Sequence, residues 1–441
     1  MAQYCLYLHW SCFDLDQLIC KLKPEIMMHP HQLLLDIALN YSALRETGNY
    51  LLLLLALPCL SAICYYCYAI YAAIEFFSHP TQIDPDFHPP ISIIKPICGL
   101  DIDTYENFAS FCFQDYPEYE IIFGVRDEGD PCVEVVREII DNFPEIDVRL
   151  VVSDRTLGTN LKVSNLANAA ELAKYDILVL ADSDVRVDAN YLRQIIQPMR
   201  DRAVGVVTCL YRPLVRGLVA ILEAVGISTE YHASVLVARS LEGMKFALGP
   251  TIAIRKTVLE AIGGFSAIAD YLADDYQLGY QPARAGYKVV LSDYIIDHAI
   301  ATESFTDLIH RQTRWYFCTR VSRPWGYLGL IFSHGTAISL LFAIATGGSF
   351  LGWAVLCVTW ITRLAMGWVV GVRCLHDLVA KKFLWLIPLR DLIGFGIWCY
   401  CFVGNTIEWR GRRLKLTTDG KLVFSIPNRD LSSAPPRRVI Q

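Results

Sequence analysis

The sequence has few charged residues for its length. Only 19% of its 441 residues are Asp, Glu, Lys or Arg, while 54% are hydrophobic, and this composition is more apolar than that of a typical soluble protein. A chain of this length also exceeds one ordinary soluble domain. The shortage of charge therefore excludes a wholly soluble protein and indicates that part of the chain lies in lipid.

Positive charge is scarce as well. The formal net charge is −6, from 39 Lys and Arg against 45 Asp and Glu. A protein that binds nucleic acid presents a basic surface to the phosphates, so we expect no nucleic-acid partner. The 15 cysteines lack the spacing of a zinc site or of a secreted disulfide framework. We interpret them as reduced packing residues that face a cytosol or a membrane.

The N-terminal part lacks the layout of a signal peptide, because no basic start leads into an apolar core and a small-residue cleavage site. Residues 1–48 are interpreted as an N-terminal extension, and Met27 and Met28 leave a later translation start open. Residues 50–77 then form an apolar run whose one charge is Glu75. Only a transmembrane helix needs so long an uncharged stretch, so a buried globular helix is the less favoured alternative.

Strand and helix patterns alternate after a proline-rich linker. The predicted strands are 91–96, 119–125, 149–152 and 175–181, and the predicted helices are 107–114, 131–142 and 163–172. This alternation is typical of βαβ units with right-handed crossovers and a parallel sheet. The sequence therefore predicts an α/β domain over residues 91–322.

Long apolar runs return in the C-terminal third. They cover residues 327–345, 349–372 and 383–407. The first two are long enough to span a bilayer, whereas the third is interrupted by Pro388 and the Arg390-Asp391 pair, which fits an interfacial helix followed by a span, or a re-entrant pair. The tail, residues 408–441, is basic, and basic segments stay in the cytosol. Because three C-terminal spans would put this tail on the opposite side from the α/β domain, we expect one segment to lie flat or fold back.

Two carboxylates follow the last predicted strand. Asp182 and Asp184 stand one residue apart after residues 175–181, at the carboxyl edge of the sheet, where ligands bind in open α/β folds. The two carboxylates can converge on one hard cation that holds phosphate oxygens. A solvated turn is the plainer interpretation of this tripeptide by itself.

Further acidic and basic clusters decide between these interpretations. They are Asp127, the pair Asp274 and Asp275, and the group Arg311, Arg314 and Trp315. Their order, together with segments 95–101, 115–120 and 158–166, resembles the membrane-bound GT-A glycosyltransferases of family 2. It resembles more closely family 21, which comprises the ceramide glucosyltransferases and their bacterial, hopanoid-associated relatives. The resemblance covers residues 91–326 and is expected to extend over the C-terminal apolar runs. Arg311 replaces the Gln of the wider family-2 box, as in family 21, and Asp274 stands where many relatives carry Glu.

The resemblance implies a GT-A domain with a Rossmann-like, mostly parallel sheet, flanked by transmembrane helices. Such an enzyme moves one sugar, glucose or N-acetylglucosamine, from a UDP-sugar to a membrane lipid with inversion. Asp184 and Asp182 would bind Mg²⁺ or Mn²⁺, and Asp275 would be the general base, with Asp274 as an alternative that the sequence does not separate from it. The residues implied to bind or position the substrates are Lys95, Asp127, Lys162, Asn165, Asp182 and Arg311, with Arg314 and Trp315 at the mouth of the site.

The expected acceptor is a lipid hydroxyl, as in ceramide or a hopanoid polyol. The protein would be an integral membrane protein with a cytosolic catalytic domain, in the inner membrane if it is bacterial. One alternative is a processive polysaccharide synthase of family 2, which needs more spans and the Gln-type box. Another is a membrane scaffold or receptor, in which Asp275 would merely cap a helix that begins near Tyr276.

Overall fold

The computed structural model describes residues 30–300, 304–409, 412–424 and 438–440. Its main element is a nine-stranded sheet in the order β12-β3-β2-β1-β4-β7-β6-β8-β5. The strands are β1 (Ile91–Pro96), β2 (Tyr119–Val125), β3 (Asp147–Val152), β4 (Ile177–Ala181), β5 (Val185–Arg186), β6 (Val204–Val215), β7 (Thr251–Arg255), β8 (Lys288–Ile300) and β12 (Arg438–Ile440).

The strands β3, β2, β1 and β4 are parallel, as are β6 and β8. The strand β7 lies antiparallel between β4 and β6. The predicted α/β class with a mostly parallel sheet is confirmed. Its parallel part forms from apolar runs such as Ile91–Pro96, which is buried along its whole length, because helices cover both faces of such a sheet.

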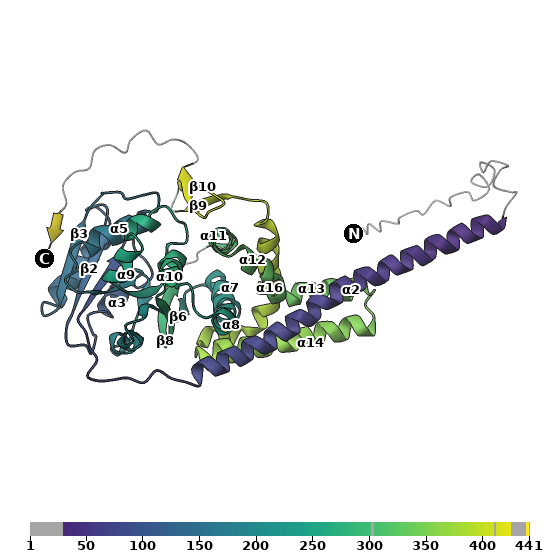
Figure 1. Ribbon diagram of the computed structural model, residues 1–441, viewed down its shortest axis with the longest axis horizontal. Helices are drawn as coiled ribbons and strands as arrows, with labels where there is room; N and C mark the ends of the chain where they lie inside the picture. The colour runs from purple at the N-terminus through teal and green to yellow at the C-terminus, as the bar shows by residue number, and fades with distance from the viewer. Residues whose placement is uncertain (1–29, 301–303, 410–411, 425–437, 441) are drawn as a thin grey trace, which may run out of the picture. The chain divides into compact units, whose positions relative to one another are not determined.

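Two apolar clusters hold the helices on the two faces of the sheet (Figure 1). One cluster joins the sheet to α3 (Thr104–Ala109), α4 (Cys132–Asn142) and α6 (Tyr191–Ile195). The other joins it to α5 (Leu161–Ala170), α9 (Lys256–Ala261) and α10 (Asp274–Arg284). The helix α3 begins three residues earlier than the predicted 107–114. It also ends earlier, at Ala109, because residues 111–113 form turns and not helix.

Further helices follow strands β6 and β8 in the chain. They are α7 (Leu218–Gly226), the π-helix η3 (Ile227–Tyr231), α8 (His232–Glu242) and α11 (Phe305–Ser322). Strands β9 (Thr406–Trp409), β10 (Arg412–Leu416) and β11 (Leu422–Phe424) form a separate antiparallel sheet. This small sheet packs through Leu414 and Leu422 against Leu272 and Phe317 of the domain.

Three helical segments are long and apolar enough to cross a membrane: Leu54–Phe77, Phe350–Cys374 and Leu378–Tyr400. The first is the end of α2 (Pro30–Phe77), the second joins α14 (Phe350–Gly367) to η6 (Trp368–Cys374), and the third includes α15 (Leu378–Phe383) and α16 (Ile387–Tyr400). A bent pair, Pro324–Ser333 with Gly335–Ala345, would make a fourth if it is one span. The predicted run 327–345 is therefore not one straight helix, because it bends by 57°.

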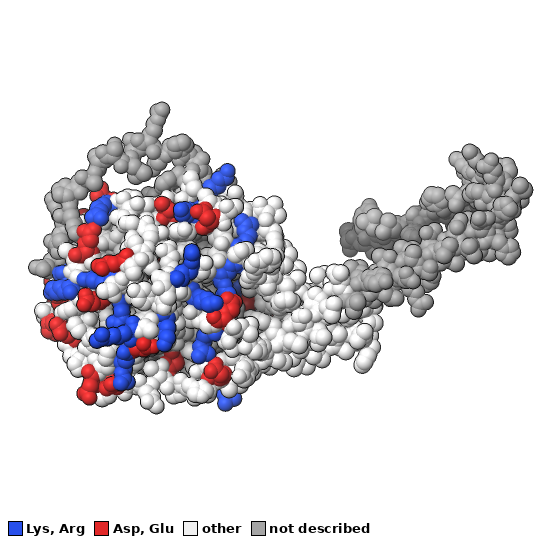
Figure 2. Space-filling model, in the orientation of Figure 1, with Lys and Arg blue, Asp and Glu red and all other residues white. Residues whose placement is uncertain are grey.

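The surface of these helices differs from that of the α/β domain. On the face shown in Figure 2, charged side chains gather over the α/β domain, and the region of α13 (Gly335–Ala345) and α14 carries almost none. Large apolar side chains such as Phe350, Leu351 and Ile361 are exposed there. Such a surface is stable in lipid and not in water, so this is a membrane protein.

Candidate active site

The Asp182-Ser183-Asp184 turn leaves the carboxyl end of β4 and is held at each of its residues. The Lys95 ammonium donates to the backbone oxygen of Asp182 over 2.8 Å. The Ser183 hydroxyl donates to the Asp101 carboxylate over 2.6 Å. The Asp184 carboxylate lies 3.1 Å from the imidazole of His298. The turn is thus fixed before any ligand binds, and it is not the solvated loop that was the plainer interpretation.

Lys95 is fully buried at the end of β1 and lies over the Phe111 ring at 3.8 Å. Burial lowers the pKa of Lys95 to about 7, although nearby carboxylates, Asp184 foremost, act in the opposite direction. A buried ammonium with a reduced pKa is common at functional sites. Here the hydrogen bond from the Lys95 ammonium to the backbone oxygen of Asp182 holds the acidic turn in place.

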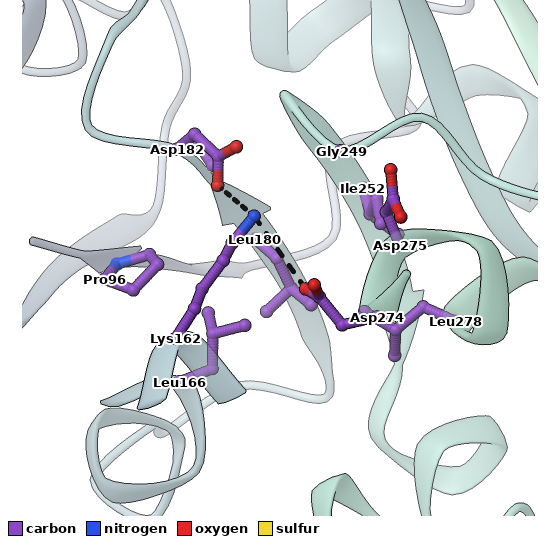
Figure 3. Close-up of a pocket in the computed structure, with 11 residues that line it drawn as sticks. Pro96, Lys162, Leu166, Leu180, Asp182, Gly249, Ile252, Asp274, Asp275 and Leu278 are labelled. Atoms are coloured by element: carbon purple, nitrogen blue, oxygen red, sulfur yellow. Dashed lines mark ion pairs between the residues drawn. The ribbon is translucent and has the colours of Figure 1, made fainter. Parts of the chain in front are cut away.

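Lys162 lies between two carboxylates (Figure 3). Its ammonium is 2.5 Å from Asp182 and 3.8 Å from Asp274. Burial alone would lower the pKa of Lys162, but the two carboxylates outweigh burial and raise it. The first turn of α5 carries this lysine because the Asn160 side chain caps the helix, accepting from the N–H groups of Lys162 and Val163. The result is a permanent cation at the carboxyl edge of the sheet.

Asp274 and Asp275 are adjacent in the first turn of α10 but have different environments. Asp274 accepts from the Asn160 amide over 3.2 Å and faces Lys162. Asp275 points away from Lys162, towards Gly249 (Figure 3). A Cβ atom at Gly249 would lie 3.0 Å from the Asp275 carboxylate, so the glycine leaves room for this group.

Burial, and then the neighbouring charge of Asp274, raise the pKa of Asp275 to about 6. The helix begins at Asp274, and its N-cap is Ala273. The interpretation of Asp275 as an N-cap is therefore wrong. A carboxylate that titrates near neutral pH in a cavity has the property required of a general base. The cavity is lined from β1, α5, β4 and α10, by Pro96, Lys162, Asp182 and Asp275 among others.

The acidic turn fits a divalent cation to a limited extent. The second oxygen of Asp184, Oδ1, is buried and has no hydrogen-bond partner. Burial raises the pKa of Asp184, but His298 and Lys162 outweigh it and hold the pKa below its ordinary value, so the group is ionised. Among the described residues, no group of three or more His, Cys, Asp and Glu could hold a metal by itself. A cation held here by Asp184 and Asp182 would need further oxygen ligands from a diphosphate and water.

Helix α11 carries the Arg311, Arg314 and Trp315 cluster, of which no residue lines the cavity of Figure 3. Arg311 lies 3.6 Å from the fully buried Glu223 of α7, and its charge is near enough to act on the pKa of His298. Arg314 and Asp275 both act on the pKa of the Cys318 thiol. Trp315 is half-buried against the core cluster of the sheet. Arg311 therefore lies near the His298 and Asp184 contact, and Arg314 lies on the side of Asp275.

Two predicted donor-binding residues stand apart from this group. Asp127 is exposed beyond the end of β2, where its carboxylate accepts the N–H of Gly129. Asn165 is buried in α5 and donates to the backbone oxygen of Ile97 over 3.4 Å. Neither lines the cavity of Figure 3. The same is true of the predicted site residues Lys95, Asp184, Arg311, Arg314 and Trp315.

Sequence reasoning missed three residues of the site: Asn160, Glu223 and His298. The position of Asn160 before a helix was a signal, since Asn is a preferred N-cap. Glu223 was the one charge in the apolar segment 217–227. His298 stands in a polar pair, Asp297-His298, at the end of an apolar strand, but nothing local shows that β8 pairs with β5 next to Asp184.

The mixed sheet, the acidic turn at the end of β4 and the carboxylate pair on α10 define a GT-A glycosyltransferase. A solved GT-A structure has the same fold: the mannosyltransferase PcManGT from Pyrobaculum calidifontis, in complex with GDP-Man and Mn²⁺. It is 17% identical, with a TM-score of 0.52 over 81% of this chain and 99% of that one. At this identity the likeness shows the fold alone.

Comparison with protein families is more specific. Residues 54–422 match glycosyl transferase family 21. The chain belongs to this family, and it is a hexosyltransferase. It is 24% identical to ceramide glucosyltransferase 1 of Caenorhabditis elegans over 92% of this chain and 87% of the relative. It is 32% identical to the ceramide glucosyltransferase of Candida albicans over 26% of this chain and 23% of the relative. The resemblance noted in the sequence is confirmed.

Proposed function

We propose that this protein transfers a single sugar from a UDP-sugar to a hydroxyl group of a membrane lipid, with inversion at the anomeric carbon. Glucose or N-acetylglucosamine would be the sugar, and ceramide or a hopanoid polyol the acceptor. The names of the relatives favour glucose and ceramide. The observation that carries the proposal is the position of Asp275: its half-buried carboxylate lines the same cavity as the Lys162 and Asp182 pair.

Asp275 would accept the proton of the lipid hydroxyl as its oxygen attacks the anomeric carbon. The new carbon–oxygen bond forms on the face opposite the diphosphate, and the sugar–phosphate bond breaks with its electron pair leaving on UDP. An α-linked donor would therefore give a β-linked product. Asp274 is less suited to this role, because Asn160 and Lys162 already hold its carboxylate.

The leaving UDP gains negative charge, and cationic groups would stabilise it. Lys162 and Arg311 are close to the acidic turn, and a guanidinium offers paired donors to phosphate oxygens. Asp184 and Asp182 would hold Mg²⁺ or Mn²⁺. When bound, such an ion acts as a Lewis acid towards the diphosphate. Asp127 would contact the uracil and ribose, with Asn165 and Lys95 supporting the segments that seat the nucleotide.

The acceptor would reach the site from the bilayer. Arg314 and Trp315 lie on α11, whose end leads into the bent pair Pro324–Ser333 and Gly335–Ala345. An indole next to a membrane offers a flat apolar face with one polar edge. We infer that these residues present the lipid head group to Asp275, with the α/β domain in the cytosol.

The direct test is to incubate membranes that contain the protein with labelled UDP-glucose or UDP-N-acetylglucosamine and to identify the labelled lipid. We expect one sugar per lipid, in β linkage. Asp275→Asn should lower kcat by about 10²–10⁴-fold, the usual contribution of a general base, while its folded fraction is unchanged. Polymeric product would support a processive synthase instead, and full activity of the Asp275→Asn variant would exclude Asp275 as the base.

A further inference from the structure

His298 makes two connections to the acidic turn. It belongs to β8, where it pairs in register with Val185 of β5. The N–H of the next residue, Ala299, donates to the backbone oxygen of Asp184 over 2.8 Å. The imidazole Nε2 lies 3.1 Å from Oδ2 of Asp184. Both the backbone and the side chain of Asp184 are thus held by one short segment of β8.

The histidine itself has little freedom to move. It is 8% exposed, and the Tyr211 ring contacts it edge-on, with ring centroids 5.1 Å apart. Its other nitrogen, Nδ1, is buried and has no hydrogen-bond partner. The contact with Asp184 is therefore the one polar contact of the ring among the described residues. A buried imidazole with a single carboxylate partner fixes the orientation of that carboxylate.

The remaining oxygen of Asp184 is the significant one. Oδ1 is buried and unpartnered, and a buried carboxylate oxygen without a partner is costly. Because His298 uses only one lone pair of Oδ2, the carboxylate is held in one orientation and keeps lone pairs for a further ligand. Asp182 is held in a different way, through Lys162 at 2.5 Å. The two carboxylates of the turn therefore have separate cationic or donor partners.

We propose that His298 is a positioning residue of the cation site, which holds the Asp184 carboxylate in one orientation for a divalent cation. This inference rests on the proposed function, in which Asp184 binds Mg²⁺ or Mn²⁺. Carboxylates that bind metals are commonly fixed by a hydrogen bond from a neighbour, and loss of such a neighbour weakens metal binding about 10–100-fold. A free carboxylate would also rotate, which costs affinity for a small cation with strict geometry.

The test measures metal binding and not turnover. The full chain, purified in detergent, is titrated with Mn²⁺ in the presence of UDP, and free Mn²⁺ is followed by electron paramagnetic resonance. We expect His298→Ala to weaken binding about 10–100-fold. His298→Gln should bind nearly as well as the unchanged protein, because its amide can donate to Oδ2.

His232→Ala is the matched control. His232 is also buried and also contacts the Tyr211 ring edge-on, with ring centroids 4.6 Å apart. Its Nε2 is hydrogen-bonded to the backbone oxygen of Tyr211 and not to Asp184. Loss of packing around Tyr211 would affect both alanine variants, whereas loss of the Asp184 contact affects only His298→Ala. We expect the His232→Ala variant to bind Mn²⁺ with unchanged affinity.

Three results would overturn the inference, and they differ. If the unchanged protein binds Mn²⁺ and Asp184→Asn does not, then normal binding by His298→Ala contradicts the positioning role alone. If the unchanged protein binds no Mn²⁺, the cation of the proposed function is excluded and the inference with it. Equal weakening in His298→Ala and His232→Ala would assign the effect to packing and also contradict the inference.

Discussion

At the scale of single residues, the site depends on the different surroundings of two adjacent aspartates. Asp274 is held by Asn160 and Lys162, whereas the Asp275 carboxylate accepts the N–H of its neighbour Tyr276 over 2.8 Å and otherwise faces the cavity. Burial with little compensation raises a carboxylate pKa. The Asp274 carboxylate is therefore held in place by its partners, whereas the Asp275 carboxylate is available to accept a proton.

The pKa of Asp275 predicts the acid limb of the pH profile. Burial and Asp274 raise this pKa from 3.8 to about 6, and only the ionised form accepts a proton. As the pH falls through 6 the base is progressively protonated, so kcat should fall about tenfold per pH unit below this value. This is checked by measuring kcat between pH 4.5 and 8 at saturating concentrations of donor and acceptor. A kcat that stays constant down to pH 5 would contradict the prediction.

Asp274→Asn tests whether this limb belongs to Asp275. The substitution removes the neighbouring negative charge that helps to raise the pKa of Asp275. The pKa should then be lower, and the acid limb should move to lower pH. If the limb stays in place or moves up, another group is responsible for it.

At the scale of secondary-structure elements, one buried ion pair fixes the packing of the membrane-associated helices. The Arg363 guanidinium of α14 donates to both carboxylate oxygens of Asp391 in α16, over 3.1 and 2.9 Å. Thr336 of α13 donates to the same carboxylate over 2.6 Å. Arg363 also donates to the backbone oxygen of Thr229 in η3 over 3.1 Å. Asp391, one of the two charges that interrupted the third apolar run, is thus paired in the interior.

Single and double substitutions of this pair should differ. Breaking a buried ion pair by removing one partner costs roughly 3–5 kcal/mol, whereas replacing both by apolar residues is often neutral. We expect Arg363→Met and Asp391→Leu each to lower the thermal unfolding midpoint in detergent, and the double variant to recover most of the loss. Arg373→Met, at an exposed position of η6, is the control and should change little.

A double variant no more stable than the single variants would show that the hydrogen bonds to Thr229 and Thr336, and not the ion pair, hold these helices together. A normal midpoint for both single variants would show that the pair contributes nothing measurable.

At the scale of the whole molecule, both ends of the Leu378–Tyr400 segment are bound to the α/β domain. At its start, Ser228 of η3 donates to Asp377 over 2.5 Å. Just after its end, Arg320 of α11 donates to the backbone oxygen of Gly404 over 2.7 Å. None of the described elements between η3 and α11 is a candidate span. We therefore expect Leu378–Tyr400 to begin and end on one side of the membrane, as a segment that lies flat would do.

The candidate spans that remain are Leu54–Phe77, the bent pair and Phe350–Cys374. At about 1.5 Å per residue, Phe350–Cys374 (25 residues) is long enough for a hydrocarbon core of about 30 Å. Its far end is the exposed turn at Gly347 and Gly348. This turn should lie across the membrane from the α/β domain, and the basic tail on the same side as the domain.

An epitope tag placed between Gly347 and Gly348 should thus be accessible from the non-cytosolic side. A second tag between the exposed Asp201 and Arg202 should be accessible only from the cytosolic side. Antibody binding to sealed vesicles of known orientation measures both. Accessibility of both tags from one side would contradict this topology and would make the bent pair and Phe350–Cys374 a re-entrant hairpin.

Much of this protein follows from local sequence patterns. The strands at 91–96 and 119–125 have the predicted bounds, because an apolar run between turn residues specifies a buried strand by itself. The order of the motifs was also sufficient to identify family 21, which the comparison confirms. Periodicity and order are local properties, so the sequence contains them directly.

The tertiary structure decided what depends on distant partners. The antiparallel insertion of β7, the contact of His298 with Asp184 and the different surroundings of Asp274 and Asp275 all join segments that are far apart in the chain. The sequence also predicted a break at Arg390 and Asp391 in the third apolar run. It does not show that Arg363, from another helix, pairs with Asp391. Burial and charge pairing arise only when the chain is folded, and for that reason the apolar runs determined the elements of this protein, while the pairing of its buried charges determined the site.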